Sequence, residues 1–177
     1  MKNNCLSFLL LLFSCLPAHA DAHLDSLLNV LDATIKEADT YVQIKENRLR
    51  ELKKEAGKTP PVSIERYNLN NRIYSEYKAY SSDSALHYLN VNRVVAQQLG
   101  DEERELKTRL ELSYLLSSTG MYMEATDILN SIERRTLPQS LLGNYYTCYE
   151  HLYAEAGAAQ PRYRMFSSRY LKLSHAY

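Results

Sequence analysis

Two stretches of the chain share one residue pattern at an offset of forty positions, and this repetition limits the fold more than any other feature. Ala85 aligns with Ala125, and Leu89 aligns with Leu129. The stretches read ALHYL and ATDIL, so both fit the pattern A-x-x-(Tyr/Ile)-Leu. Periods of about 20 to 50 residues are typical of repeat proteins, in which each unit buries its apolar face only against its neighbours. The sequence therefore predicts a stack of repeated units.

The units are expected to be helical throughout. Glycine and proline are scarce and cluster in short separators such as AGKTPPVS, LGDEE, STGMY, TLPQS and AGAAQPR. The runs between them are rich in Leu, Glu, Lys, Arg and Ala, which favour helices, and none shows a sustained strand pattern. Short links make neighbouring helices antiparallel. Helices are predicted over His23–Glu55, Ser63–Tyr80, Ser84–Leu99, Glu102–Ser118, Met123–Arg135, Pro138–Ala156 and from about Arg162 to the end.

The repeated alanines mark points where paired helices are expected to cross closely. A small residue is needed there, and the leucine one turn later fills the space beside it. Gly120 is expected to end the helix before the second copy, because glycine accepts a left-handed backbone without strain. Tyr74 and Tyr114 share the same offset, and a weaker copy, SSRYL at Ser167–Leu171, follows at an offset of forty-two. The predicted packing residues of the repeat are Ala85, Leu89, Gly120, Ala125 and Leu129.

The stretch GMYMEA (120–125) resembles the turn and the small-residue position of tetratricopeptide repeats (TPRs), whose period is about 34 residues. The period here is longer, and Arg109 and Ser113 stand where TPRs have bulkier packing residues. The resemblance implies an all-α fold of TPR-like helical hairpin repeats, a right-handed α-solenoid, preceded by a long N-terminal amphipathic helix. It also implies that the first helix of each hairpin lines a concave surface.

Two longer stretches, LDSLLNVLDATIKEADTYVQIKENRLRELK (24–53) and LLSSTGMYMEATDILNSI (115–132), are similar to the extracytoplasmic region of membrane-anchored transcriptional regulators of Bacteroidetes. Those regulators join a helical-repeat sensor to a membrane helix, a coiled coil and a cytoplasmic DNA-binding region. The present chain reaches Tyr177, within the expected third hairpin, without a membrane helix or output domain. The resemblance therefore implies a sensor region, as a fragment, a truncated paralogue or a stand-alone protein.

The first twenty residues are predicted to be a signal peptide, so the mature chain is expected to be exported to the periplasm. Lys2 precedes an apolar run of about a dozen residues, and Ala18 and Ala20 supply the small residues that signal cleavage requires. Two alternatives stay open: an uncleaved leader, and lipoprotein processing that anchors the chain through Cys15. The predicted organisation is a signal peptide at 1–20, a long helix at 21–58 and a TPR-like repeat domain at 59–177.

The first predicted helix carries an apolar seam with heptad spacing, which Lys45 interrupts once. Two interpretations stay open. The helix covers the end of the repeat domain, or it pairs in a coiled-coil homodimer through residues 24–52, with Lys45 as a polar register position. The seam comprises Leu24, Leu28, Leu31, Ile35, Ala38, Val42, Leu49 and Leu52.

Composition and motifs argue against several classes of function. The chain has 21 basic and 21 acidic side chains, so no excess positive charge favours nucleic acid. Cys148 is the only cysteine after the leader, so no internal disulfide is expected. The sequence has no phosphate-binding loop, nucleophile elbow or metal motif, and no two histidines after the leader stand four residues apart. Catalysis, a metal site and a bound cofactor are therefore not expected.

Tyrosine is unusually frequent, with fifteen residues against three phenylalanines and no tryptophan. Many lie in RYNLNNRIYSEYKAY and NYYTCYEHLY, within the first helices of their hairpins. An apolar ring with a hydroxyl tip suits a recognition surface, although core packing with the hydroxyl at the rim also accounts for many of them. Tyr74 and Tyr114 are the first candidates, since they share a repeat position. The residues predicted on the concave binding surface are Tyr74, Tyr77, Tyr114 and Tyr149.

The sequence favours an exported, non-catalytic module that binds a protein or peptide, as the sensory or scaffolding part of a signalling system. Two alternatives from other classes stay open. The first helix dimerises the chain while the repeats act as a spacer, or the aromatic surface binds glycans as an accessory protein. Nucleic acid is not expected as a partner, and membrane contact is expected only through a lipid or an uncleaved leader.

Overall fold

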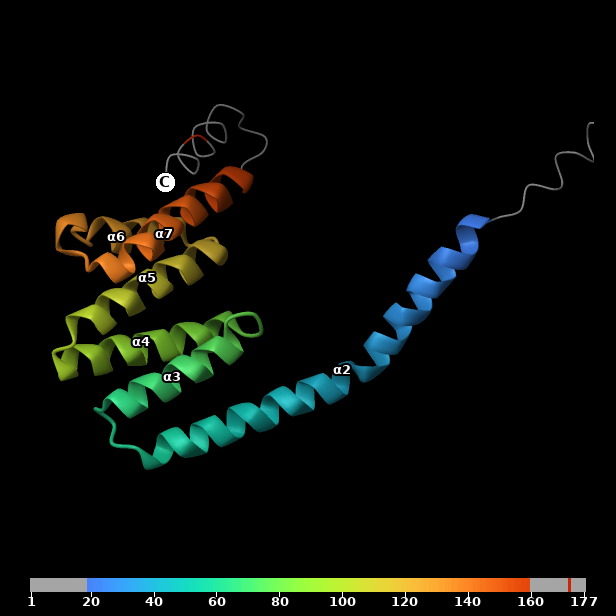
Figure 1. Cartoon of the computed structure of the whole chain (residues 1–177), viewed down its shortest axis with the longest axis horizontal. Coiled ribbons are helices and arrows are strands. Elements are labelled where there is room, and N and C mark those ends of the chain that lie inside the picture. The colour runs from blue at the N-terminus through green and yellow to red at the C-terminus, as the bar shows by residue number, and fades with distance from the viewer. Residues whose placement is uncertain (1–18, 160–171, 173–177) are drawn as a thin grey trace, which may run out of the picture. The chain divides into compact units, whose positions relative to one another are not determined.

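The computed structural model describes residues 19–159 and residue 172, and Figure 1 shows how its helices are arranged. This part of the chain is helical and contains no strand, so the predicted all-α, TPR-like fold is confirmed. The elements are α2 (His19–Lys58), α3 (Ile64–Tyr77), α4 (Ser82–Leu99), α5 (Glu102–Ser118), α6 (Tyr122–Asn130), the 3-10 turn η1 (Arg134–Thr136) and α7 (Gln139–Ala158).

The chain divides into two compact units, residues 1–46 and residues 47–177. Among the described residues, the first unit consists of the N-terminal part of α2. The second unit contains the rest of α2 and all helices from α3 onward. The main hydrophobic core begins at Leu49 and lies in the second unit, which contains the packed helices from α3 to α7.

Consecutive helices of the second unit pack against each other as hairpins. α3 packs on α4 and α5 packs on α6, which gives two hairpins, and α4 packs on α5 and so joins them (Figure 1). α7 packs on both α5 and α6. α5 therefore contacts α7, the helix that follows its hairpin, as well as its own partner α6.

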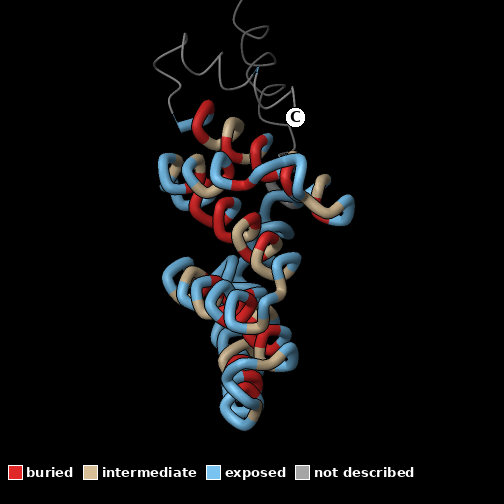
Figure 2. Tube along the Cα trace, turned by 90° about the vertical axis from the view of Figure 1, so that its left-hand side faces the viewer, coloured by how far each residue is buried: buried red, intermediate tan, exposed pale blue. Residues whose placement is uncertain are grey.

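The repeated alanines and leucines lie at the centre of each hairpin. Ala85 and Leu89 in α4, and Ala125 and Leu129 in α6, are all 0% exposed. An alanine at a helix crossing lets two backbones approach, and the leucine one turn later fills the adjoining space. Figure 2 shows buried segments alternating with exposed ones along the helices. Burying one leucine contributes about 1.5–3 kcal/mol to folding.

The two ends of α5 are fixed by residues that suit helix caps. Asp101 accepts a hydrogen bond from the backbone N–H of Arg104 at 2.9 Å and caps the start of the helix. Gly120 follows the end of the helix with a φ of 83°, in the left-handed region. The next N–H, of Met121, donates to the carbonyl oxygen of Leu116 at 2.9 Å and satisfies a terminal carbonyl. α5 therefore has the bounds that the sequence predicted.

The predicted helix Met123–Arg135 is wrong in its second half, since α6 stops earlier and η1 follows. The Ser131 hydroxyl accepts a hydrogen bond from Arg109 at 2.6 Å and donates one to the carbonyl oxygen of Ile128. Such a side chain competes with the helical backbone for hydrogen bonds. Ile132 then turns into the core, where it is 4% exposed. These contacts end the helix.

Other helix boundaries shift by a few residues. α2 extends beyond the predicted His23–Glu55 at both ends. α3 stops at Tyr77 instead of Tyr80, because the chain turns there toward Ser81, the N-cap of α4. No residue of this turn has a positive φ.

The apolar seam of α2 has two different environments. Leu49 and Leu52 are 1% and 4% exposed and belong to the core of the second unit. From Leu24 to Val42, the large apolar side chains of the seam are 45–60% exposed. The buried leucines are not available to a partner, so the predicted homodimer seam through residues 24–52 is too long. An interface formed by this seam is restricted to the residues before Lys45.

Several predicted features lie outside the described residues. They are the signal peptide up to residue 18, the lipid-anchor alternative at Cys15, the helix from about Arg162 and the weak repeat copy at Ser167–Leu171. His19 and Ala20 form the start of α2.

Candidate binding groove

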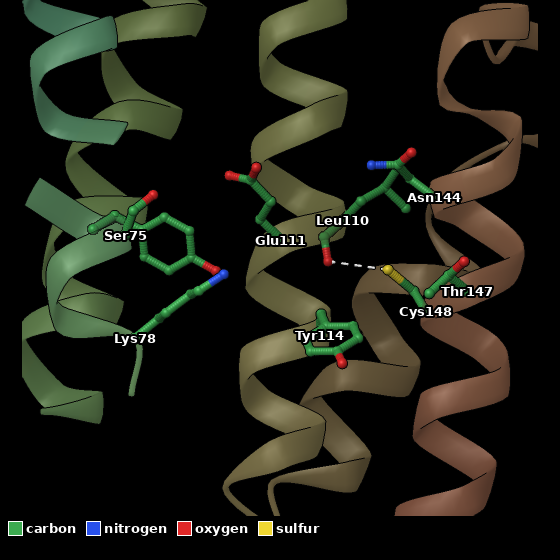
Figure 3. Close-up of a pocket in the computed structure, with 9 residues that line it drawn as sticks. Ser75, Lys78, Leu110, Glu111, Tyr114, Asn144, Thr147 and Cys148 are labelled. Carbon is green, nitrogen blue, oxygen red and sulfur yellow. Dashed lines mark hydrogen bonds between the residues drawn. The ribbon is translucent and has the colours of Figure 1, made fainter. Parts of the chain in front are cut away.

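A groove lies between α3, α5 and α7, and its volume is about 380 Å³. Figure 3 shows Glu111 of α5 extending toward Ser75 and Lys78, while the residues of α7 line the opposite side. Most of the lining side chains carry polar groups. The lining residues are Tyr74, Ser75, Lys78, Leu110, Glu111, Tyr114, Asn144, Thr147 and Cys148.

Two of the four tyrosines predicted on the binding surface line this groove. Tyr74 in α3 is 9% exposed, whereas Tyr114 in α5 is 40% exposed. Burial raises the pKa of Tyr74 to about 12, and the negative charge of Glu111 adds to the rise. The Tyr114 ring stacks on His151, with centroids 3.8 Å apart and an interplanar angle of 9°. The stack holds the Tyr114 ring while much of the side chain stays accessible.

The other two predicted tyrosines lie away from the groove. Tyr77 accepts a hydrogen bond from Lys53 of α2 at 2.7 Å and stacks on Tyr88 of α4 at 5.9 Å. The hydroxyl of Tyr149 donates to the side-chain oxygen of Asn130, at the end of α6, at 3.1 Å. Both tyrosines are buried in the core. Each points toward a neighbouring helix of its own domain and neither lines this groove, so their role in binding stays a prediction.

Glu111 has a buried carboxylate oxygen, Oε2, in the groove, and no described residue donates a hydrogen bond to it. Burial raises the pKa of Glu111, and the positive charges of Lys107 and Lys78 offset part of the rise. A buried acceptor without a donor costs about 1–3 kcal/mol. A ligand that brings an N–H or O–H group to this atom would reduce that cost.

Cys148 lies on the α7 side of the groove and is unsuited to nucleophilic chemistry. Its thiol is buried and donates to the carbonyl oxygen of Leu110 at 3.3 Å. Burial raises the pKa of Cys148 to about 11, and Glu111 shifts it in the same direction. Nucleophilic cysteines have lowered pKa values and reach solvent. Cys148 is therefore a packing residue of the groove.

The sequence analysis missed the polar part of the groove. A usable signal was present, because the three lining residues of each helix fall within one helical turn, at spacings of one, three and four positions, and so share one face.

The groove is chemically suited to reversible binding. It combines a carboxylate, an ammonium group, an amide, hydroxyl groups and an aromatic ring on a rigid helical framework. Within the described part of the chain, no group of His, Cys, Asp and Glu side chains is arranged to hold a metal ion. None of the helices described has the length and apolarity needed to cross a bilayer.

Stacked helical hairpins with a groove between α3, α5 and α7 define a TPR-type repeat domain, a class that serves in protein interaction or sensing and is typically non-catalytic. A family model described as the N-terminal TPR domain of SusR matches residues 35–177, and the chain belongs to this family. The match begins within α2 and covers every helix from α3 to α7. No curated protein and no solved structure matches the chain.

Proposed function

We propose that this chain is an exported, non-catalytic module that binds a protein or peptide segment in the groove between α3, α5 and α7. It acts as the sensory or scaffolding part of a signalling system. Membership of the TPR family supports a role in interaction or sensing. The N-terminal sequence pattern supports export to the periplasm.

The observation that carries the proposal is the unpartnered Glu111 carboxylate oxygen in an open groove. An extended peptide presents backbone N–H groups, which can donate hydrogen bonds to the Glu111 carboxylate. Its backbone carbonyl groups can accept hydrogen bonds from the Lys78 ammonium and the Asn144 amide. The Tyr114 ring adds an apolar surface with a polar tip. A purely apolar ligand would leave these groups buried and unpaired, which is costly.

A peptide-array screen followed by titration in solution tests this proposal. We expect selected peptides to bind in the micromolar range, and we expect Tyr114→Ala and Glu111→Leu each to weaken binding about tenfold. Tyr80→Ala is the matched control, because Tyr80 is a 47% exposed tyrosine that does not line the groove. Its dissociation constant should stay within about twofold of the original.

Three results would contradict the proposal. The first is a screen in which no peptide binds. The second is binding that survives both groove substitutions and disappears with added salt, because this describes adsorption to the charged surface. The third is binding of oligosaccharides alone, lost in the groove variants, which would support the glycan-binding alternative. Circular dichroism of each variant shows whether its helices are intact, so unfolding is not mistaken for lost contacts.

The exported location has its own test. Mass spectrometry of the chain recovered after export distinguishes cleavage after Ala20 from acylation at Cys15 and from an uncleaved leader. We expect a chain that begins at Asp21, since Ala18 and Ala20 provide the small residues for cleavage. A lipid mass on Cys15 would replace this proposal with the lipid-anchored alternative.

A further inference from the structure

The N-terminal part of α2 presents an apolar stripe that no described residue buries. Leu28 is 47% exposed, Leu31 is 52% exposed and Ile35 is 60% exposed. Leucine and isoleucine are usually among the most buried residues in a protein. A continuous row of exposed apolar side chains indicates an interaction surface.

The stripe has the spacing of a two-stranded coiled-coil seam, in which heptad positions a and d face the partner helix. β-branched residues at a together with leucine at d favour two parallel strands. Ile35 and Val42 are β-branched residues at a positions, and Leu24 and Leu31 are leucines at d positions. The a positions are Leu28, Ile35 and Val42, and the d positions are Leu24, Leu31 and Ala38.

We propose that residues 24–42 of α2 pair with the same residues of a second copy of this chain, in parallel and in register. The resulting homodimer interface is separate from the groove and does not depend on the function proposed for the groove.

The acidic side chains beside the seam determine the direction of pairing. Asp25, Asp32 and Asp39 occupy the three successive e positions. In an antiparallel pair, e positions face e positions, so Asp32 would lie beside the partner's Asp32 and Asp25 beside the partner's Asp39. Like charges placed opposite each other are destabilising. In a parallel pair, e positions face g positions, so the partner's Asp32 lies beside Leu27 and the partner's Asp39 beside Thr34. Parallel pairing therefore avoids the repulsion.

The buried part of α2 sets the end of the interface. The next d position after Val42 is Lys45, and a charged residue within a seam lowers its stability. Beyond it, Leu49 and Leu52 pack in the core of their own repeat domain. The same heptad pattern thus serves an intermolecular contact before Lys45 and an intramolecular contact after it.

Sedimentation of the chain from Asp21 onward tests the interface. We expect a dimer at concentrations of about 10 μM and above, since three heptads give modest affinity. Leu31→Asp should weaken dimerisation at least about 100-fold, because it places two carboxylates in the seam. Val30→Asp is the matched control: Val30 is adjacent and 61% exposed, but it lies off the seam, so this variant should still dimerise.

The direction of pairing has an independent test in Thr34→Lys. In a parallel pair the new ammonium group faces the partner's Asp39, so dimerisation should tighten about 2–5-fold at low salt. In an antiparallel pair, the two substituted residues face each other and dimerisation should weaken. Single cysteine variants Leu24→Cys and Val42→Cys should each form disulfide-linked dimers, because parallel pairing places identical residues within bonding distance.

Four outcomes would overturn the proposal. They are a monomer at every concentration, equal loss of dimer in Leu31→Asp and Val30→Asp, weaker pairing in Thr34→Lys, and disulfide formation only in a mixture of the two cysteine variants. The repeat domain folds from other residues, so circular dichroism of Leu31→Asp should keep the helical signal of the second unit.

Discussion

The hairpins α3–α4 and α5–α6 are two copies of one unit, and they agree in their buried centre but differ at their surfaces. The alanine and leucine positions are fully buried in both copies. The shared tyrosine position is 9% exposed at Tyr74 and 40% exposed at Tyr114. Glu111 has Asn71 at the equivalent position, and the Asn71 side-chain oxygen accepts a hydrogen bond from Asn92 at 2.8 Å. The repeat therefore fixes how helices cross, while its outer positions are free to differ.

The largest expected effect tests the agreement between the copies. Leu89→Ala and Leu129→Ala should each lower the free energy of unfolding by about 2–5 kcal/mol, because both remove a side chain with 0% exposure and leave a cavity. Urea unfolding followed by circular dichroism measures both variants. Met123→Ala, at a side chain of α6 that is 79% exposed, is the control and should change stability by less than about 0.5 kcal/mol. A small effect at either buried leucine would show that the two copies are not packed alike.

The next effect concerns the tyrosine position. Because burial raises the pKa of Tyr74 to about 12, the unfolded chain releases this proton first as the pH rises above 10. Stability should therefore fall between pH 10 and about 12, by about 2–3 kcal/mol from this residue. Tyr74→Phe should not show this part of the loss of stability, and below pH 10 its stability should differ little from that of the original protein. Equal slopes of stability against pH in both proteins would contradict the burial of the Tyr74 hydroxyl.

A smaller effect on stability is expected at the turns within the two hairpins, because their backbone conformations differ. Gly120 has a φ of 83°, whereas Tyr80, at the equivalent position of the first hairpin, has no positive φ. A Cβ atom at residue 120 meets nothing within 4 Å, so Gly120→Ala tests the backbone conformation alone. It should destabilise by about 1 kcal/mol. Gly57→Ala, within α2 and equally unobstructed, should instead stabilise by roughly 0.5–1 kcal/mol. If both variants changed the free energy of unfolding in the same direction, the left-handed backbone at Gly120 would be contradicted.

The same comparison explains how much of the molecule the sequence predicts. The offset of forty residues predicts the fold, because helix crossing requires a small residue wherever two backbones meet. It also identifies Tyr74 and Tyr114 as candidate binding residues, because they occupy the same position of the repeat. It does not predict that Tyr77 and Tyr149 turn into the core, since that depends on contacts with α2, α4 and α6. Nor does it predict the burial of Glu111, because the helices that enclose this carboxylate are distant in sequence.

The smallest expected effect concerns Glu111, which aligns with the uncharged Asn71 of the first copy, and its sign depends on pH. Burial raises the pKa of Glu111 above the usual 4.5, so above pH 4.5 the unfolded chain loses its proton more readily than the folded chain. Stability should fall as the pH rises through the interval between the two pKa values. Glu111→Gln removes this dependence, so the variant should melt higher than the original protein at neutral pH and should have no such advantage below pH 4.5.

A bound peptide should reduce the advantage of Glu111→Gln at neutral pH, because it supplies the missing donor to the carboxylate of the original protein and stabilises that protein more than the variant. Thermal melts with and without a peptide selected on the array measure this difference. A variant that melts lower than the original at neutral pH without peptide would show that the Glu111 carboxylate is already satisfied within the domain. An advantage that peptide leaves unchanged would show that the ligand does not reach this residue, even if the groove binds it.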